Sequence, residues 1–130
     1  MADLSALSQK YSPVVEVINR FAPEGARVED ESLDGEQLHL RASVPSQVIL
    51  NRVWDEIKKV DPTFADLKHE IVNTGGQEQA YTIKSGDNLS KISQHFYGDA
   101  KYYAEIASAN HISDPNKIQV GQPLTIPVRS

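Results

Sequence analysis

Cysteine is absent from the 130-residue sequence, which excludes disulfide bonds and thiolate metal sites. Long apolar runs are absent too: none approaches the roughly 18 residues that a membrane-spanning helix needs. The first residues, 1–5, have neither the basic segment nor the apolar segment of a secretory signal. The last two absences predict a cytoplasmic protein without a membrane span, whereas the lack of cysteine does not identify a compartment.

An excess of positive charge is also missing. The chain has 13 Lys and Arg against 18 Asp and Glu, a net charge of −5, which argues against nucleic acid as a partner. The negative charge lies in residues 1–76, with 8 basic and 13 acidic side chains, whereas residues 77–130 have 5 of each. Between these parts a polar stretch contains paired glycines, Gly75 and Gly76. We therefore predict two domains, at 5–73 and 79–128, joined by a flexible linker at 74–78.

Patterns that indicate catalysis are not found. The four histidines lie far apart and do not form a metal-binding motif such as HExxH. No serine lies in a nucleophile elbow, and no glycine-rich loop suits a phosphate. A group of carboxylates at residues 29–36 does not have the spacing of an EF-hand loop, so we interpret it as solvated charge on a hairpin. The prediction is a protein with no catalytic residues, no enzymatic activity and no resident organic cofactor.

The first part of the chain alternates helical and strand patterns. Ser12 and Pro13 suit a helix start, and an apolar stripe follows at Val14, Val17, Ile18 and Phe21. A weak strand is expected at 27–33, and Asp34-Gly35 indicates a type I′ hairpin. The clearest strand has apolar residues at every second position: Leu38, Leu40, Ala42 and Val44.

A second helix is predicted after Pro45 and Ser46. Its apolar stripe contains Ile49, Val53, Ile57 and Val60, joined by Leu50 and Trp54. Asp61-Pro62 ends this helix, and Leu67, His69 and Ile71 outline a last strand. The predicted element order is αββαβ, an α+β arrangement with Trp54 packed inside it.

The second part of the chain predicts a βααβ unit. Tyr81 and Ile83 alternate with polar residues as in a half-buried strand, Gly86 permits a tight turn, and Asp87 is expected to cap the first helix. Helix-spaced apolar residues, a Gly98 stop with Asp99 as the next cap, and a closing strand follow. The expected core positions are Leu89, Ile92 and Phe96, then Tyr102 or Tyr103, Ile106, Ala107 and Ala109, then Leu124 and Ile126 after a turn at Gly121.

The order YTIKSGDNLSKIS, YG, IASAN and IQVGQPLTIP resembles the LysM family over residues 80–127. The resemblance implies binding of polymers that contain N-acetylglucosamine, such as peptidoglycan or chitin. The fold would bring together two loops that offer both polar and apolar contacts. The glycan-binding residues so predicted are Gly86, Asp87, Asn88, Leu89, Asp114, Pro115, Asn116, Ile118 and Gln119. The alternative is that they serve only as caps and turns.

The αββαβ order of residues 5–73 resembles a BON domain, and its fusion to LysM resembles the bacterial BON–LysM potassium-binding proteins. The resemblance implies a potassium ion held by main-chain carbonyls, for which the candidates are Lys59, Asp61 and Thr63. Their loop, 59–65, lacks glycine and contains Pro62, although a carbonyl ring needs unusual backbone turns.

The helix connection at 96–103 resembles the LysM type of BON–LysM proteins and of phage-tail-like assemblies. Three binding functions therefore stay open: a glycan, a potassium ion, or a protein partner in an assembly. We expect a monomer.

Overall fold

The computed structural model describes residues 3–129 and shows an α+β protein, as predicted. Residues 1 and 2 lie outside this range; they belong to the segment 1–5, for which no secretory signal was predicted. The N-terminal region contains α1 (Leu4–Lys10), α2 (Ser12–Arg20), η1 (Ala22–Glu24), β1 (Arg27–Asp34), β2 (Gln37–Ser46), α3 (Gln47–Val60) and β3 (Leu67–Gly76). The C-terminal region contains β4 (Gln79–Thr82), α4 (Leu89–Tyr97), η2 (Ala100–Tyr102), α5 (Tyr103–Ala109) and β5 (Pro123–Ile126).

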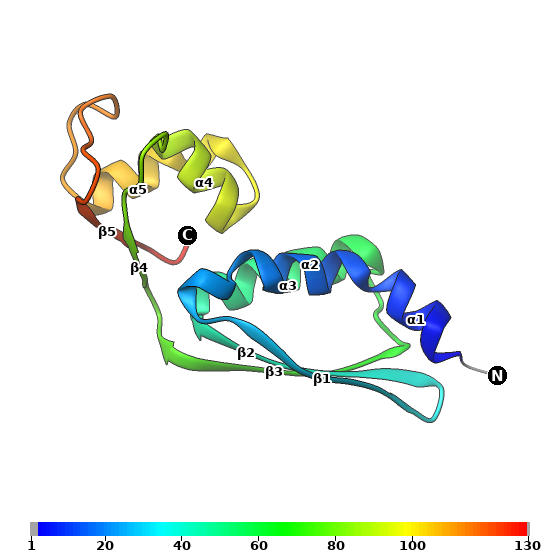
Figure 1. The fold of residues 1–130 in the computed structure, drawn as a ribbon. Coiled ribbons are helices and arrows are strands. Elements are labelled where there is room, and N and C mark those ends of the chain that lie inside the picture. The colour runs from blue at the N-terminus through cyan, green and yellow to red at the C-terminus, as the bar shows by residue number, and fades with distance from the viewer. Residues whose placement is uncertain (1–2, 130) are drawn as a thin grey trace.

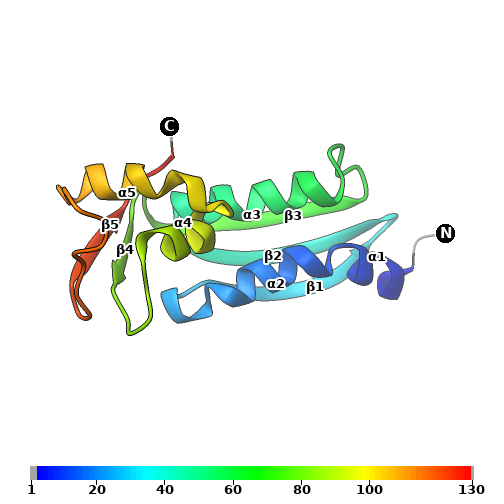
Figure 2. The same cartoon turned by 90° about the horizontal axis from the view of Figure 1, so that it is seen from above.

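The N-terminal region is a three-stranded sheet with helices on one face (Figure 1). The strand order is β1-β2-β3, with β1 antiparallel and β3 parallel to the central strand. Because β2 and β3 are parallel, the chain crosses between them through α3, which packs beside α2 on the sheet (Figure 2). The alternation that predicted β2 is confirmed: all four of its apolar side chains are at most 2% exposed.

The hairpin between β1 and β2 lies where it was predicted, but its turn is of a different type. Asp34 pairs with Gln37, so the two loop residues are Gly35 and Glu36. Only Gly35 has a positive φ, 61°, whereas a type I′ turn needs positive φ at both central residues. The prediction of a type I′ turn centred on Asp34-Gly35 is therefore wrong.

The helices of the N-terminal region pack the apolar side chains that the sequence pattern indicated. Ser46 caps α3 by accepting a hydrogen bond from the Ile49 N–H at 3.3 Å. Trp54 is half-buried, and its ring packs edge-on against Phe64 and His69, with ring centroids 5.3 and 4.5 Å away. Its predicted packing is confirmed. Two features were not predicted: helix α1, and the complete burial of Tyr11.

In the C-terminal region, α4 and α5 cover a two-stranded antiparallel sheet, β4-β5. The predicted apolar core is confirmed at Leu89, Ile92, Phe96, Ile106, Ala107, Leu124 and Ile126. Two details differ. Asn88, one residue after Asp87, caps α4 through its side-chain oxygen, 2.8 Å from the Lys91 nitrogen. Ala109 is exposed because it lies on the solvent side of the last turn of α5.

The expected linker, residues 74–78, is mostly strand in the structure. β3 continues to Gly76, so only Gln77 and Glu78 separate it from β4. The Gln77 carbonyl accepts a hydrogen bond from the Val48 N–H at 3.3 Å, which ties this junction to the start of α3.

The two regions also touch through aromatic rings. Phe21 lies 4.5 Å from the His95 ring and 5.6 Å from the Phe96 ring, centroid to centroid. Within residues 3–129, no helix combines the length and the apolar character that crossing a bilayer requires.

Candidate functional site

The two loops predicted for glycan binding meet at the surface of the C-terminal region. They form a groove of about 400 Å³, lined by Asn88, Leu89, Ser90, Tyr103, Pro115 and Asn116. We call these six residues the loop groove. It unites two segments more than twenty residues apart in the sequence because the βααβ fold places the start of α4 beside the loop before β5.

Two loop-groove residues were not predicted, Ser90 and Tyr103. Ser90 lies in the first turn of α4, next to the predicted loop. Tyr103 begins α5 and is 39% exposed, so an aromatic ring is available at the groove. The sequence pattern left open whether Tyr102 or Tyr103 packs in the core. Tyr102 is the half-buried one, with Tyr97 and Arg129 against its ring.

The loop before β5 is held by short-range hydrogen bonds. The Asp114 carboxylate accepts from the Asn116 N–H at 3.0 Å, and its carbonyl accepts from the Lys117 N–H at 3.0 Å. Ile118 is partly buried against the core, and the Gln119 N–H donates to the Gln122 side chain at 3.1 Å. Asp114, Ile118 and Gln119 therefore shape the loop, while Pro115 and Asn116 line the groove.

Gly86 and Asp87 lie outside the loop groove. Gly86 has a φ of 88° and forms the turn after β4. The Asp87 carboxylate accepts from the Tyr81 hydroxyl at 2.6 Å and from the Lys84 N–H at 2.8 Å. Burial is the main cause that raises the pKa of Tyr81, and the hydrogen bond from its hydroxyl to Asp87 raises this pKa further. Asp87 thus closes its own turn and faces the N-terminal region, where it shares a hollow with Glu24.

The loop predicted to hold potassium follows α3. Phe64 has a positive φ of 36°, so the unusual backbone turn that seemed to need glycine occurs at a bulky residue. The Asp61 carbonyl accepts from the Phe64 N–H at 3.1 Å, and the Ala65 carbonyl accepts from the Gln37 side chain at 3.0 Å. Of the three carbonyls predicted to bind potassium, that of Asp61 therefore already accepts a hydrogen bond within the loop.

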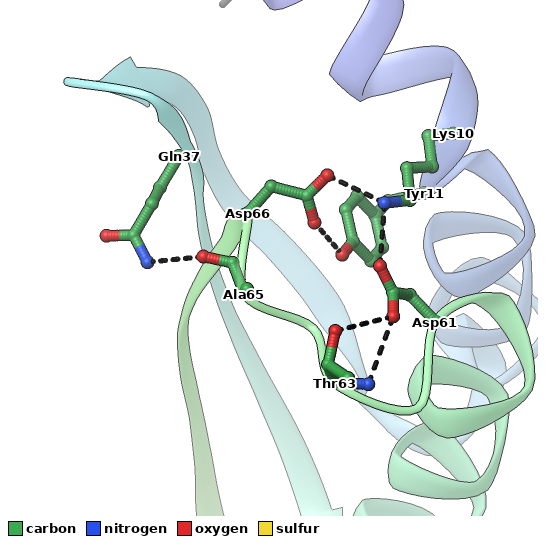
Figure 3. Close-up of polar contacts among 7 residues, drawn as sticks. All are labelled: Lys10, Tyr11, Gln37, Asp61, Thr63, Ala65 and Asp66. Carbon is green, nitrogen blue, oxygen red and sulfur yellow. Dashed lines mark hydrogen bonds and ion pairs between the residues drawn. The ribbon is translucent and has the colours of Figure 1, made fainter.

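An ammonium group lies beside this loop (Figure 3). The Lys10 Nζ donates to Asp61 at 2.8 Å and to Asp66 at 2.6 Å, and the Tyr11 hydroxyl donates to the other oxygen of Asp66. The second Asp61 oxygen accepts from the N–H and hydroxyl of Thr63 at 3.0 and 2.9 Å. These contacts connect the junction of α1 and α2 to the loop before β3.

Lys10, Asp61 and Asp66 form a cluster in which each charged form is stabilised by the opposite charge beside it. The hydrogen bond from Lys10 is the main cause that lowers the pKa of Asp61, and the hydrogen bonds from Thr63 lower it further. Partial burial alone would raise the pKa of Asp66, but hydrogen bonds from Lys10 and Tyr11 outweigh it, and the net direction is downward. Hydrogen bonds to Asp61 and Asp66 raise the pKa of Lys10. At neutral pH the cluster is therefore one cation held between two carboxylates.

Comparison with known proteins identifies the C-terminal region. Residues 81–127 match the family model of the LysM domain. A protein of Deinococcus radiodurans is 54% identical over 50 residues, which are 38% of this chain and 20% of that protein. The chitin elicitor-binding protein of Oryza sativa subsp. japonica is 44% identical over 48 residues, 37% of this chain and 14% of that protein.

A third relative is similar over a longer stretch. The potassium binding protein Kbp of Escherichia coli O6:H1 is 51% identical over 77 residues, 58% of this chain and 44% of that protein. Since residues 81–130 number only 50, this similarity includes part of the N-terminal region. The chain spans less than half the length of each of these three relatives. Residues 81–127 form a LysM domain, as the sequence motifs predicted.

Proposed function

We propose that this chain is a non-enzymatic binding protein whose LysM domain recognises a polymer containing N-acetylglucosamine at the loop groove. The observation that carries the proposal is the meeting of Asn88 with Pro115 and Asn116 in one groove, as glycan contact from both loops requires. The LysM match and the similarity to a chitin elicitor-binding protein support it.

The chemistry of the loop groove suits an acetamido sugar. Such a sugar has an amide that needs hydrogen bonds, and a methyl group and ring face that favour apolar contact. Asn88, Ser90 and Asn116 supply polar groups, while Pro115 and the exposed ring of Tyr103 supply apolar surface. Because the groove is small, we expect affinities on the order of micromolar to millimolar for short oligomers.

Titration with chitin or peptidoglycan oligomers, followed by amide NMR shifts, tests this function. We expect saturable shifts at 88–90, 103 and 116, with smaller shifts at Gly86 and Asp87 because these lie outside the groove. An absence of shifts at millimolar oligomer would contradict glycan binding and favour a protein partner.

A substitution at Tyr103 tests the apolar half of the groove. Tyr103→Ala is expected to weaken oligomer binding by about fivefold, since aromatic contacts of this kind contribute on the order of 1 kcal/mol. Tyr103→Phe is the matched control and should retain most of the affinity because it keeps the ring. Because Tyr103 is exposed, both variants are expected to fold, and the amide spectrum of each variant checks this.

Potassium binding is a second candidate function, and the similarity to Kbp favours it. Potassium is large and weakly hydrated enough to be held by carbonyl oxygens alone. The proposed ligands are the carbonyls of Lys59, Asp61 and Thr63, at a helix end where carbonyls lack intrahelical partners. The ammonium of Lys10 lies on the carboxylate side of this loop, 2.8 Å from Asp61, and would repel a second cation nearby.

Calorimetric melts in potassium, sodium and choline chloride at equal ionic strength test this candidate. If the loop binds potassium, potassium should raise the melting temperature well above the sodium value, because the folded state binds the ion preferentially. Lys10→Gln removes the competing ammonium and should enlarge the difference between the salts. Identical melts in all three salts, for the chain and for this variant, would exclude the potassium function.

A further inference from the structure

The loop groove is lined entirely by uncharged side chains. Its six residues are two asparagines, a serine, a tyrosine, a leucine and a proline. Four of them are exposed and can reach a ligand: Asn88, Ser90, Tyr103 and Asn116. Their amide and hydroxyl groups form hydrogen bonds with a ligand but do not neutralise a charge on it. The groove therefore suits a ligand that is itself uncharged.

Two of the lysines nearest to the groove in the sequence have their ammonium groups elsewhere. The Lys91 ammonium donates to the Gly86 carbonyl at 3.3 Å, and Gly86 lies outside the groove. The Lys101 ammonium lies 5.1 Å from the centre of the Tyr102 ring and 3.8 Å from the Asp99 carboxylate. Neither ammonium group is placed to pair with an anion in the groove.

Asp114 and Lys117 flank the groove in the loop before β5. The Asp114 carboxylate is fixed beside the groove because it accepts a hydrogen bond from the Asn116 N–H at 3.0 Å. Lys117 is exposed, and its long side chain would lose rotational freedom if it paired with a ligand. A carboxylate bound at Asn116 would therefore meet a fixed negative charge at close range, while the positive charge of Lys117 is not fixed.

Charge divides the polymers that contain N-acetylglucosamine into two classes. Chitin is a chain of N-acetylglucosamine alone and is uncharged. Peptidoglycan alternates this sugar with N-acetylmuramic acid, whose lactyl ether ends in a carboxylate, either free or extended by a peptide that has carboxylates of its own. Taking a carboxylate out of water without a cation beside it costs free energy, whereas acetamido and hydroxyl groups need only hydrogen bonds.

We propose that the loop groove binds stretches of unsubstituted N-acetylglucosamine in preference to sugars with a carboxylate, which the fixed charge of Asp114 repels. This preference rests on the glycan-binding function proposed above and narrows its substrate class to uncharged, chitin-type oligomers. Asn88, Ser90 and Asn116 form hydrogen bonds with the acetamido and hydroxyl groups, and Tyr103 packs against a sugar face. Because no ion pair contributes to binding, the affinity depends little on salt.

Titration of the intact chain with three tetrasaccharides, followed by amide NMR shifts, tests the preference. The first is the chitin tetramer. The second alternates N-acetylglucosamine with N-acetylmuramic acid and has free carboxylates, and the third is its primary amide, which has the same size without the charge. We expect the chitin tetramer to bind about fivefold tighter than the acid form, as for one close pair of like charges in water, and the amide form to recover most of this difference.

Failure of glycan binding and failure of the preference give different results. Absence of binding by all three tetrasaccharides would contradict the glycan-binding function and the preference with it. Equal affinities of the chitin tetramer and the acid form would overturn the preference and leave glycan binding intact. An amide form as weak as the acid form would also overturn it, because the bulk of the lactyl group would then be decisive. So would a chitin affinity that changes more than about twofold between about 0.05 and 0.5 M sodium chloride.

Two charge-removing variants test the role of Asp114. Asp114→Asn keeps an oxygen that can accept from the Asn116 N–H, so the loop is expected to fold, but it removes the fixed charge. It should reduce the affinity ratio of amide to acid form by about twofold or more. Glu36→Gln is the matched control. It removes the same charge at the tip of the β1–β2 hairpin, which lies at the opposite end of the molecule from the LysM domain (Figure 1), and it should leave the ratio unchanged. Equal ratios in the two variants would overturn the proposal.

Discussion

Replacing Ile106 by alanine is expected to lower the free energy of unfolding by about 2–5 kcal/mol, the range for large-to-small changes in a core. Ile106 is completely buried in α5, which contacts both α4 and β5. In so small a domain the surrounding side chains cannot shift far enough to close the cavity that the substitution leaves. Urea denaturation followed by circular dichroism measures the loss.

Val120→Ala is the matched control for Ile106→Ala. Val120 is 69% exposed, and its truncation should change the free energy of unfolding by less than about 0.5 kcal/mol. A similarly small effect for Ile106→Ala would mean that the packed face of α5 is not the one described.

Gly75→Ala is expected to destabilise the chain by about 3 kcal/mol, the upper end of the range for overpacking. A Cβ at Gly75 would lie 1.9 Å from the carbonyl oxygen of Pro45, so backbone would have to move. This close approach occurs where the pairing of β2 with β3 shifts register, between Val44 and Ser46. Thermal and urea unfolding of the variant measure the effect.

The adjacent glycine provides the control. A Cβ at Gly76 meets no atom within 4 Å, so Gly76→Ala should change stability by less than about 1 kcal/mol. If Gly75→Ala is as mild as Gly76→Ala, β3 does not approach β2 as closely as the structure shows.

Patterns of apolar residues predicted the elements that bury them. The alternation from Leu38 to Val44 predicted β2, and the spacing of Leu89, Ile92 and Phe96 predicted the buried stripe of α4. Both succeed because burial on one face repeats with the period of the strand or helix. The LysM motifs added the order of the elements and the pair of loops that form the groove.

Features decided by single contacts could not be predicted in the same way. Asp87 and Asn88 are both good caps, and only the hydrogen bonds that Asp87 accepts from Tyr81 and Lys84 show that Asp87 is otherwise engaged. The paired glycines suggested flexibility, but Gly75 is needed for its close contact with Pro45. Tyr103 belongs to the loop groove because of where α5 begins, which its sequence neighbours do not reveal.

The direct passage from β3 into β4 has a mechanical consequence. β3 has 10 residues, so it extends about 33 Å from the loop at 59–65 to the LysM domain. A strand paired along its length is stiff, and only Gln77 and Glu78 separate it from the next strand. Asp66 lies directly before β3 and accepts a hydrogen bond from Lys10. A displacement of Asp66 would therefore be transmitted along β3 to the LysM domain.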